Sequence, residues 1–356
     1  MKVIGREVLF LKSKDNNPRN GEGTFIRLNN GGILFAYSRF TGKDWFDECA
    51  ADIAAITSYD EGETWQEERI LFEHDENSRN YMCPNLLRMN NGDIGLIYLR
   101  KDRHSENSAA YIARSSDEGK SFSTPQRIGN DYENYFVVEN DHVIRLSSGR
   151  IIMPANIHSE KINGKIEVLE HGYKCIFASD DDGLTWNEIA QRQDTPFPEQ
   201  SETGLQETYV FEEKSGRLRA FSRTDLGFQF ECFSEDGGTT WSEPKPNRFF
   251  SSPDSPLIMR NVGSHTVAIF NPIPNYVIRP EDNTWGRTPL VCAVSDDNGK
   301  SFEKIFALED DPDNGYCYPA VINGEGYFLV AYYHSDNSEC PLNACRIKKI
   351  LFSEIG

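Results

Sequence analysis

The sequence predicts an all-β protein, a six-bladed β-propeller formed as a single domain over residues 1–356. Two observations lead to this fold class. One octapeptide pattern recurs five times, and six segments read as strand, short polar turn and strand. Repeats with a period above about 40 residues are typical of propellers and arrays. The chain is also rich in glycine (27) and proline (17), which suits many short strands joined by turns.

The octapeptide reads Ser-x-Asp-x-Gly-x-Thr/Ser-Trp/Phe. Ser and Asp side chains can bond nearby backbone N–H groups and close a tight turn, glycine supplies a positive φ, and the final aromatic ring anchors the turn. A calcium loop is the alternative for the third copy, but no Glu stands at the twelfth loop position, so we expect no metal. The copies are SYDEGETW (58–65), SSDEGKSF (115–122), SDDDGLTW (179–186), SEDGGTTW (234–241) and SDDNGKSF (295–302).

The second repeated unit is a predicted hairpin in each blade. We expect the ring to close where VIGREVLFL (3–11) pairs with ACRIKKILF (344–352), because such pairing removes exposed sheet edges. The six hairpins are FIRLNNGGILFAYSR (25–39), LLRMNNGDIGLIYLR (86–100), VIRLSSGRIIMPANI (143–157), YVFEEKSGRLRAFSR (209–223), LIMRNVGSHTVAIFN (257–271) and YPAVINGEGYFLVAYYH (318–334).

Composition excludes several classes of partner. The net charge of −19 disfavours nucleic acid, and no apolar run is long enough for a membrane helix. The N-terminus has no signal-peptide pattern, and the eight cysteines form no CxxC pair. We therefore expect a cytoplasmic protein with free thiols, although Cys340 and Cys345 could pair. The residues give no indication of a cofactor, and the oligomeric state stays open.

The octapeptides and hairpins together resemble the Asp-boxes and blades of the sialidase (neuraminidase) superfamily, over nearly the whole chain. The resemblance implies an exo-acting glycoside hydrolase with three arginines on the substrate carboxylate, a tyrosine nucleophile activated by a glutamate, and an aspartate acid/base. Arginine matches a carboxylate bidentately, and a phenol needs a neighbouring carboxylate to take its proton. In this family the Asp-boxes are structural.

The resemblance assigns four residues in chain order. Glu207 and Arg223 flank one hairpin as the family's glutamate and second arginine do, and Arg287, eight residues before the fifth Asp-box, resembles the third arginine. In NGYCYPAVI, Tyr316 is the best match to the nucleophile, with Tyr318 as a close rival and substrate-binding candidate.

The first blade departs from the family pattern. Its PRNGEGTFIRL segment offers Arg19 as the first arginine, with Glu22 where an apolar residue is expected. Arg27 is the rival, but Arg27, Arg88 and Arg145 recur at equivalent hairpin positions, which favours a structural or surface role for all three.

The acid/base is expected before the first Asp-box, in KDWFDECAADIAAITS. Asp47 is our choice, with Glu48 and Asp52 as rivals. In VVENDHVIRL, Asp141 is expected to face the pocket and bind substrate, whereas His142, like His158, is more simply explained as a surface or packed histidine.

The predicted function is cleavage of a terminal sialic acid or another acidic or modified sugar. The alternatives are a non-catalytic carbohydrate-binding propeller, or a glycosidase or lyase acting on a non-sialic sugar. Hydrogen-bond contact between Glu207 and Tyr316 would distinguish an enzyme from a binding module.

Overall fold

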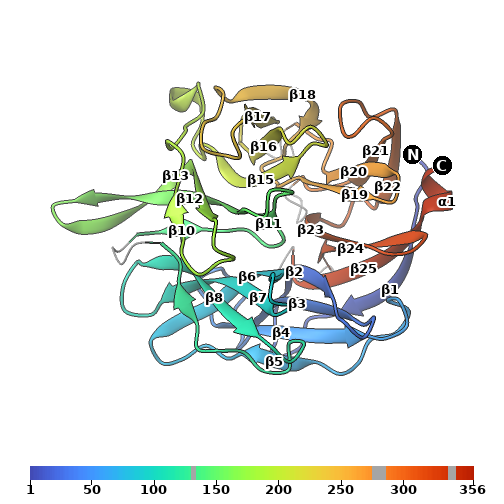
Figure 1. Ribbon diagram of the computed structural model, residues 1–356, viewed down its shortest axis with the longest axis horizontal. Helices are drawn as coiled ribbons and strands as arrows, with labels where there is room; N and C mark the ends of the chain where they lie inside the picture. Colours follow the sequence, from blue (N-terminus) through green and yellow to red (C-terminus); the bar gives the residue numbers. More distant parts are fainter. Residues whose placement is uncertain (130–133, 275–285, 336–341) are drawn as a thin grey trace.

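The computed structural model describes residues 1–129, 134–274, 286–335 and 342–356. It is an all-β propeller in which the sheets surround a common centre (Figure 1). The innermost strands, which meet there, are β2 (Asn20–Arg27), β6 (Ser78–Arg88), β11 (Ile144–Arg145), β15 (Gln206–Glu212), β19 (Ile258–Val262) and β23 (Tyr316–Asn323). The only helices among the described residues are short, η1 (Pro198–Gln200) and α1 (Phe352–Ile355). No described helix is long and apolar enough to cross a membrane.

Three of the sheets contain four strands each, in antiparallel order. One combines the two ends of the chain, and the other two follow one another in sequence. Their strands are β1 (Arg6–Leu11), β25 (Ala344–Leu351), β24 (Tyr327–His334) and β23 (Tyr316–Asn323); β15 (Gln206–Glu212), β16 (Leu218–Arg223), β17 (Phe228–Ser234) and β18 (Lys245–Ser251); and β19 (Ile258–Val262), β20 (His265–Phe270), β21 (Leu290–Ser295) and β22 (Lys304–Glu309).

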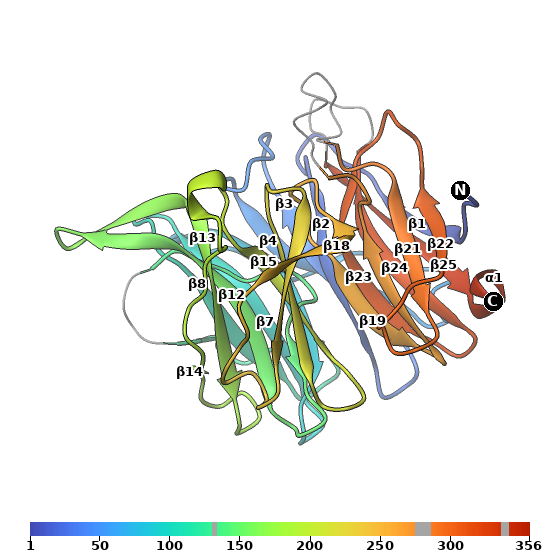
Figure 2. The same ribbon diagram turned by 90° about the horizontal axis from the view of Figure 1, so that it is seen from above.

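The fourth sheet has five strands, and its longest hairpin projects beyond the body of the molecule (Figure 2). Its strands are β10 (Phe136–Val137), β11 (Ile144–Arg145), β12 (Ile151–Ile162), β13 (Lys165–Ser179) and β14 (Asn187–Glu188).

The fifth sheet has eight strands, in two antiparallel groups that a single parallel pair, Ala51 with Asn80, connects. The groups are β2 (Asn20–Arg27), β3 (Ile33–Phe40), β4 (Ala51–Ser58) and β5 (Arg69–Phe72), then β6 (Ser78–Arg88), β7 (Ile94–Asp102), β8 (Ser108–Ser115) and β9 (Gln126–Arg127).

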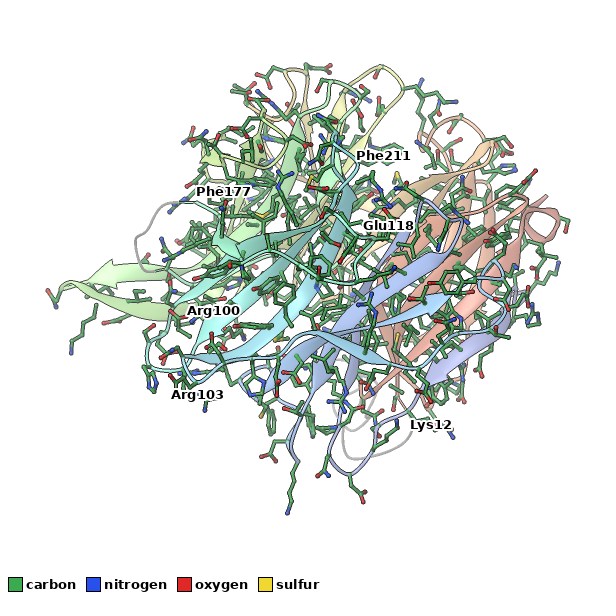
Figure 3. All side chains as sticks on the ribbon, turned by 60° about the horizontal axis from the view of Figure 1, so that its bottom comes forward. Lys12, Arg100, Arg103, Glu118, Phe177 and Phe211 are labelled. Atoms are coloured by element: carbon green, nitrogen blue, oxygen red, sulfur yellow. The ribbon has the colours of Figure 1, made fainter. Side chains whose placement is uncertain are left out.

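The two ends of the chain lie in one sheet. β1 pairs antiparallel with β25 from Arg6 opposite Lys349 to Leu11 opposite Cys345, which is the strand pair expected to close the ring. The core lies between neighbouring sheets, where side chains such as Phe177 of β13 and Phe211 of β15 are buried (Figure 3). Cys340 lies outside the described residues, so the expectation that it is a free thiol, and the alternative that it pairs with Cys345, stay untested.

All five octapeptides form the predicted turn. In each, the glycine N–H donates to the serine Oγ at 2.7–2.9 Å, and the serine hydroxyl donates to the aspartate at 2.7–2.9 Å. The glycines have φ of 76–90°, as a left-handed turn requires. The serines are Ser58, Ser115, Ser179, Ser234 and Ser295.

A second regular feature lies at the centre of the ring. Six non-glycine residues, each within or just before an innermost strand, have φ between 45° and 57°. Four of them interrupt the strand pairing as β-bulges. Such a backbone is costly outside glycine and concentrates at functional sites. The residues are Glu22, Cys83, Asp141, Glu207, Asp254 and Tyr318.

We predict that Ser179→Ala destabilises the fold by about 1–3 kcal/mol, because it leaves the buried Gly183 N–H without its acceptor. Urea unfolding checks this, with Ser148→Ala as the control, since Ser148 is exposed in a hairpin turn of the same sheet. Equal stability of the two variants would contradict a structural role for the octapeptide serine.

Candidate active site

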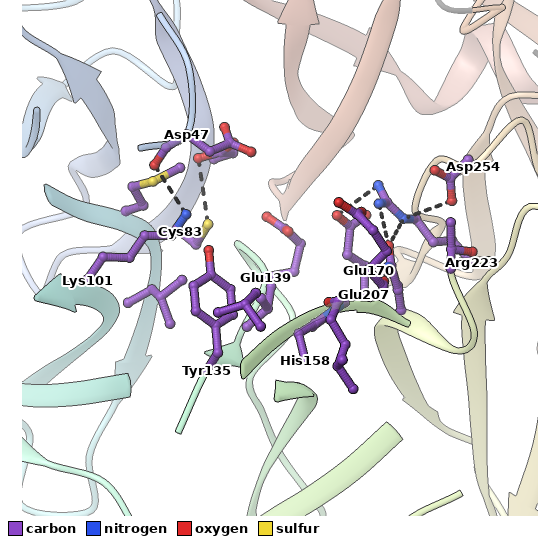
Figure 4. Close-up of a pocket in the computed structure, with 18 of the residues that line it drawn as sticks. Asp47, Cys83, Lys101, Tyr135, Glu139, His158, Glu170, Glu207, Arg223 and Asp254 are labelled. Atoms are coloured by element: carbon purple, nitrogen blue, oxygen red, sulfur yellow. Dashed lines mark hydrogen bonds and ion pairs between the residues drawn. The ribbon is translucent and has the colours of Figure 1, made fainter. Parts of the chain in front are cut away.

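Two cavities open at the centre of the ring. The larger has a volume of about 570 Å³ and the smaller about 260 Å³, and both are lined by Asp47, Arg223 and Tyr318. The smaller cavity is completed by Arg19, Trp45, Phe46, Arg287 and Leu342. Figure 4 shows the larger one, with Glu207, Arg223 and Asp254 on one side and Asp47, Cys83 and Lys101 on the other.

Tyr318 and Glu207 form the central contact of the site. The Tyr318 hydroxyl donates to Glu207 Oε1 at 2.8 Å, and Arg223 Nη1 lies 2.8 Å from that oxygen and 3.0 Å from the phenol. Glu207 Oε2 is buried and has no hydrogen-bond donor among the described residues. A phenol against a carboxylate is the geometry for general-base activation of a nucleophile.

The prediction that Tyr316 meets Glu207 is wrong, and the rival Tyr318 takes that place. Tyr316 is 1% exposed, packs edge-on against Tyr332 and His334, and lines neither cavity. In a regular strand Tyr316 and Tyr318 would face the same side. The bulge that begins at Tyr318, with φ of 54°, breaks this alternation.

Arg223 and Arg287 converge as predicted. Besides Glu207, Arg223 Nε lies 3.2 Å from Asp254 Oδ1. Arg287 donates to the Asp254 carbonyl at 2.8 Å, and its guanidinium lies 5.5 Å from the centre of the Tyr318 ring. Both arginines line the smaller cavity beside the phenol.

Arg19, not its rival Arg27, completes the cluster. Arg19 is 7% exposed, donates to the Tyr333 hydroxyl at 2.7 Å, and forms ion pairs with Glu22 and Asp47. Arg27 instead pairs with Glu61 of the first octapeptide.

The recurring hairpin arginines line neither cavity, in keeping with the structural or surface role predicted for them. Arg88 and Arg145 repeat the contact of Arg27 to the next octapeptides, with Glu118 and Asp182 as their partners.

Asp47 is on the loop between β3 and β4, in both cavities, and its side chain is 63% exposed. Partial burial would raise its pKa, but the charges of Arg19 and Lys101 outweigh this and lower the pKa to about 2. Of its rivals, Glu48 lines the larger cavity and pairs with Lys101, whereas Asp52 lies in β4 and contacts His74.

The prediction that Asp141 faces the pocket is wrong. Its carboxylate accepts hydrogen bonds from the Thr24 hydroxyl (2.9 Å) and the Val321 N–H (3.2 Å), and forms an ion pair with Arg260 (3.0 Å). These groups belong to other inner strands, and Asp141 lines neither cavity. The side chain therefore ties strands together at the centre of the ring.

The two histidines behave differently. His142 is a packed residue, as expected, because it is 2% exposed and contacts Tyr209 edge-on. His158 lines the larger cavity.

A family model described as a BNR repeat-like domain matches residues 29–330. The chain belongs to the BNR-repeat family. No curated protein sequence matches it.

Solved structures with this fold include two sialic-acid enzymes. A leech intramolecular trans-sialidase has a TM-score of 0.75 and 15% identity, over 99% of this chain and 71% of that one. The intramolecular trans-sialidase from Ruminococcus gnavus has a TM-score of 0.74 and 14% identity, over 98% and 97% of the two chains. A Dyadobacter fermentans protein of unknown function has a TM-score of 0.71 and 17% identity, over 97% and 99%.

Sequence reasoning missed several residues of this BNR-repeat site: Cys83, Lys101, Glu139 and Asp254 all line the larger cavity. Glu139 stands in the quoted VVENDHVIRL segment, two residues before Asp141, and no spacing rule selects between them. Asp254, like Asp141, lies just before an innermost strand. Its side chain reaches the cavity from a backbone with φ of 57°, and the sequence does not reveal that angle. Within the described ranges, no group of three or more metal-ligating side chains is suited to a metal ion.

Burial controls the protonation of the catalytic candidates. It raises the pKa of Glu207 above the usual glutamate value, although Arg223 and Arg287 oppose the shift. Burial, reinforced by Glu207, also raises the pKa of Tyr318 well above its usual value. The phenol therefore stays protonated until a base removes its proton.

We predict that Arg223→Met costs this BNR-repeat protein about 3 kcal/mol or more of stability, because it leaves the buried carboxylate of Glu207 and the largely buried one of Asp254 without their cation. Arg27→Met should cost less than about 1 kcal/mol, since the Arg27–Glu61 pair is solvent-accessible. Chemical denaturation of both variants measures the difference. A smaller loss of stability in Arg223→Met than in Arg27→Met would show that the ion pairs of Arg223 with Glu207 and Asp254 do not stabilise the fold.

Proposed function

We propose that this protein is an exo-acting glycoside hydrolase of the sialidase type, with Tyr318 as nucleophile and Glu207 as its base. The observation that carries the proposal is the 2.8 Å contact between the Tyr318 hydroxyl and Glu207, beside a cavity that Arg19, Arg223 and Arg287 line. Three guanidinium groups around one small cavity suit a sugar that carries a carboxylate at the reacting carbon.

The chemistry follows from these positions. Glu207 accepts the phenol proton while the Tyr318 oxygen bonds to the anomeric carbon, and the bond to the leaving oxygen breaks as that oxygen takes a proton from Asp47. Water then attacks the anomeric carbon as the bond from that carbon to the Tyr318 oxygen breaks. Asp47 takes a proton from the water, and Glu207 returns its proton to Tyr318. Two displacements at one carbon retain the anomeric configuration.

Asp47 must hold a proton to act as an acid, yet its ion pair with Arg19 lowers its pKa to about 2. A substrate carboxylate bound by Arg19 would compete with Asp47 for the same guanidinium. The exchange would remove the charge that keeps Asp47 ionised and add a negative charge nearby, and both effects raise a carboxyl pKa. In this proposal, substrate binding therefore prepares the acid.

The same proposal includes a ring of six blades in a single domain over residues 1–356. The eight-stranded sheet divides into two four-stranded groups that only the Ala51–Asn80 pair connects, which supports counting it as two blades. The left-handed residues at the centre support the same count, because one accompanies each of six innermost strands.

Tyr318→Phe should lower kcat/KM by orders of magnitude on an aryl α-sialoside, or on whichever aryl glycoside of a small panel the protein cleaves. Tyr316→Phe is the matched control, because it removes the same hydroxyl two residues away and outside both cavities. Full activity of Tyr318→Phe would refute the nucleophile and leave a carbohydrate-binding propeller as the better explanation.

The acid limb of the pH–kcat profile should lie above pH 4.5, the ordinary pKa of a glutamate, because Glu207 must be ionised to accept the phenol proton and its pKa is raised. The kcat profile is the one to measure, since it reports the substrate complex, in which the proposal has Asp47 protonated. Activity should thus fall as pH drops through the pKa of Glu207. Glu207→Gln should lose about 10²–10⁴-fold in rate and lose this limb. An unchanged limb in that variant would assign the titration to another group.

A further inference from the structure

Glu139 is a buried carboxyl group that the proposed mechanism does not use. It lies between β10 and β11, is 5% exposed, and lines the larger cavity. Among the described residues its one hydrogen-bond partner is the N–H of Asn140, 2.9 Å from Oε1. The group therefore keeps hydrogen-bonding capacity that its surroundings do not use.

The other buried or largely buried carboxylates of this cavity each have a cation. Glu22 pairs with Arg19, while Glu207 and Asp254 pair with Arg223. Glu139 has no ion pair among the described residues. Burial, followed by the charges of Glu207 and Glu22, raises its pKa well above the usual value. A protonated carboxyl group donates one hydrogen bond and accepts others, so it complements a hydroxyl group.

The position of Glu139 indicates which part of a sugar it would meet. Arg19 and Arg287 line the smaller cavity, whereas Glu139 lines only the larger one, between the Asp47–Lys101 side and the Glu207–Arg223 side (Figure 4). With the anomeric carbon at Tyr318 and its carboxylate among the arginines, the opposite edge of the pyranose ring enters the larger cavity.

We propose that Glu139 is a specificity-determining residue that binds one free hydroxyl group of the terminal sugar, on the edge of the ring remote from the anomeric carbon. This inference rests on the proposed function. A site built around a buried hydrogen-bonding group rejects the analogue that lacks the matching hydroxyl, because the protein group is then left unpaired.

The test is a double-mutant cycle on binding, which needs no turnover. Calorimetry measures the affinity of free sialic acid and of its monodeoxy analogues at the ring positions and on the exocyclic chain. One ring analogue should bind the wild type about ten- to hundredfold more weakly than the parent acid. Glu139→Met should abolish that penalty, and Glu139→Gln should keep it, since the amide also donates and accepts.

Glu202→Gln is the matched control, because it removes a carboxylate from the exposed rim of the same cavity and should leave the penalty in place. Survival of the full penalty in Glu139→Met, or no penalty for any ring analogue in the wild type, would overturn the role of Glu139 while the Tyr318 chemistry stands. Failure of the wild type to bind the parent acid would overturn both. If Tyr318→Phe kept its turnover rate while the affinities for the parent acid and its analogues were as expected, the nucleophile role of Tyr318 would be refuted and the role of Glu139 would stand.

Discussion

Burying a charged side chain at the centre of this propeller costs free energy unless an opposite charge pairs with it. The contact of Arg223 with Glu207 and Tyr318 satisfies this constraint. Arg223 joins a carboxylate, a phenol and a second carboxylate, Asp254, within 3.2 Å. The charges of Arg223 and Arg287 partly offset the burial that raises the pKa of Glu207. Stability and the proposed chemistry thus rest on the same ion pairs.

The backbone delivers these groups to the centre. A strand alternates its side chains, so a regular inner strand would send only every second residue to one face. Residues in the left-handed conformation, such as Glu207 and Tyr318, break the alternation and turn functional side chains toward the cavities. Strain of this kind persists only where the surrounding structure holds it, and the regular strand pairs on either side of each bulge provide that support.

The sequence was most informative where chemistry is local. The Ser-x-Asp-x-Gly pattern predicts its own hydrogen bonds, and the recurrence of Arg27, Arg88 and Arg145 predicted a role outside the pocket. The order of Glu207, Arg223 and Arg287 likewise predicted which side chains meet. The prediction failed where one backbone angle decides the outcome: a bulge at Tyr318 exchanges it for Tyr316, and Asp141 turns to other inner strands while Glu139 takes the cavity. Residue spacing does not reveal a positive φ at a non-glycine residue.

The most direct test of the Tyr318 nucleophile is to trap the covalent intermediate. A sialic-acid analogue with fluoride at the anomeric carbon and a second fluorine on the neighbouring ring carbon slows both displacements, while its good leaving group still permits the first. Peptide mass spectrometry after incubation with the protein should locate the sugar on Tyr318. An adduct on Tyr316 or on a carboxylate, or hydrolysis of a substrate with inversion and no adduct at all, would contradict the proposed nucleophile.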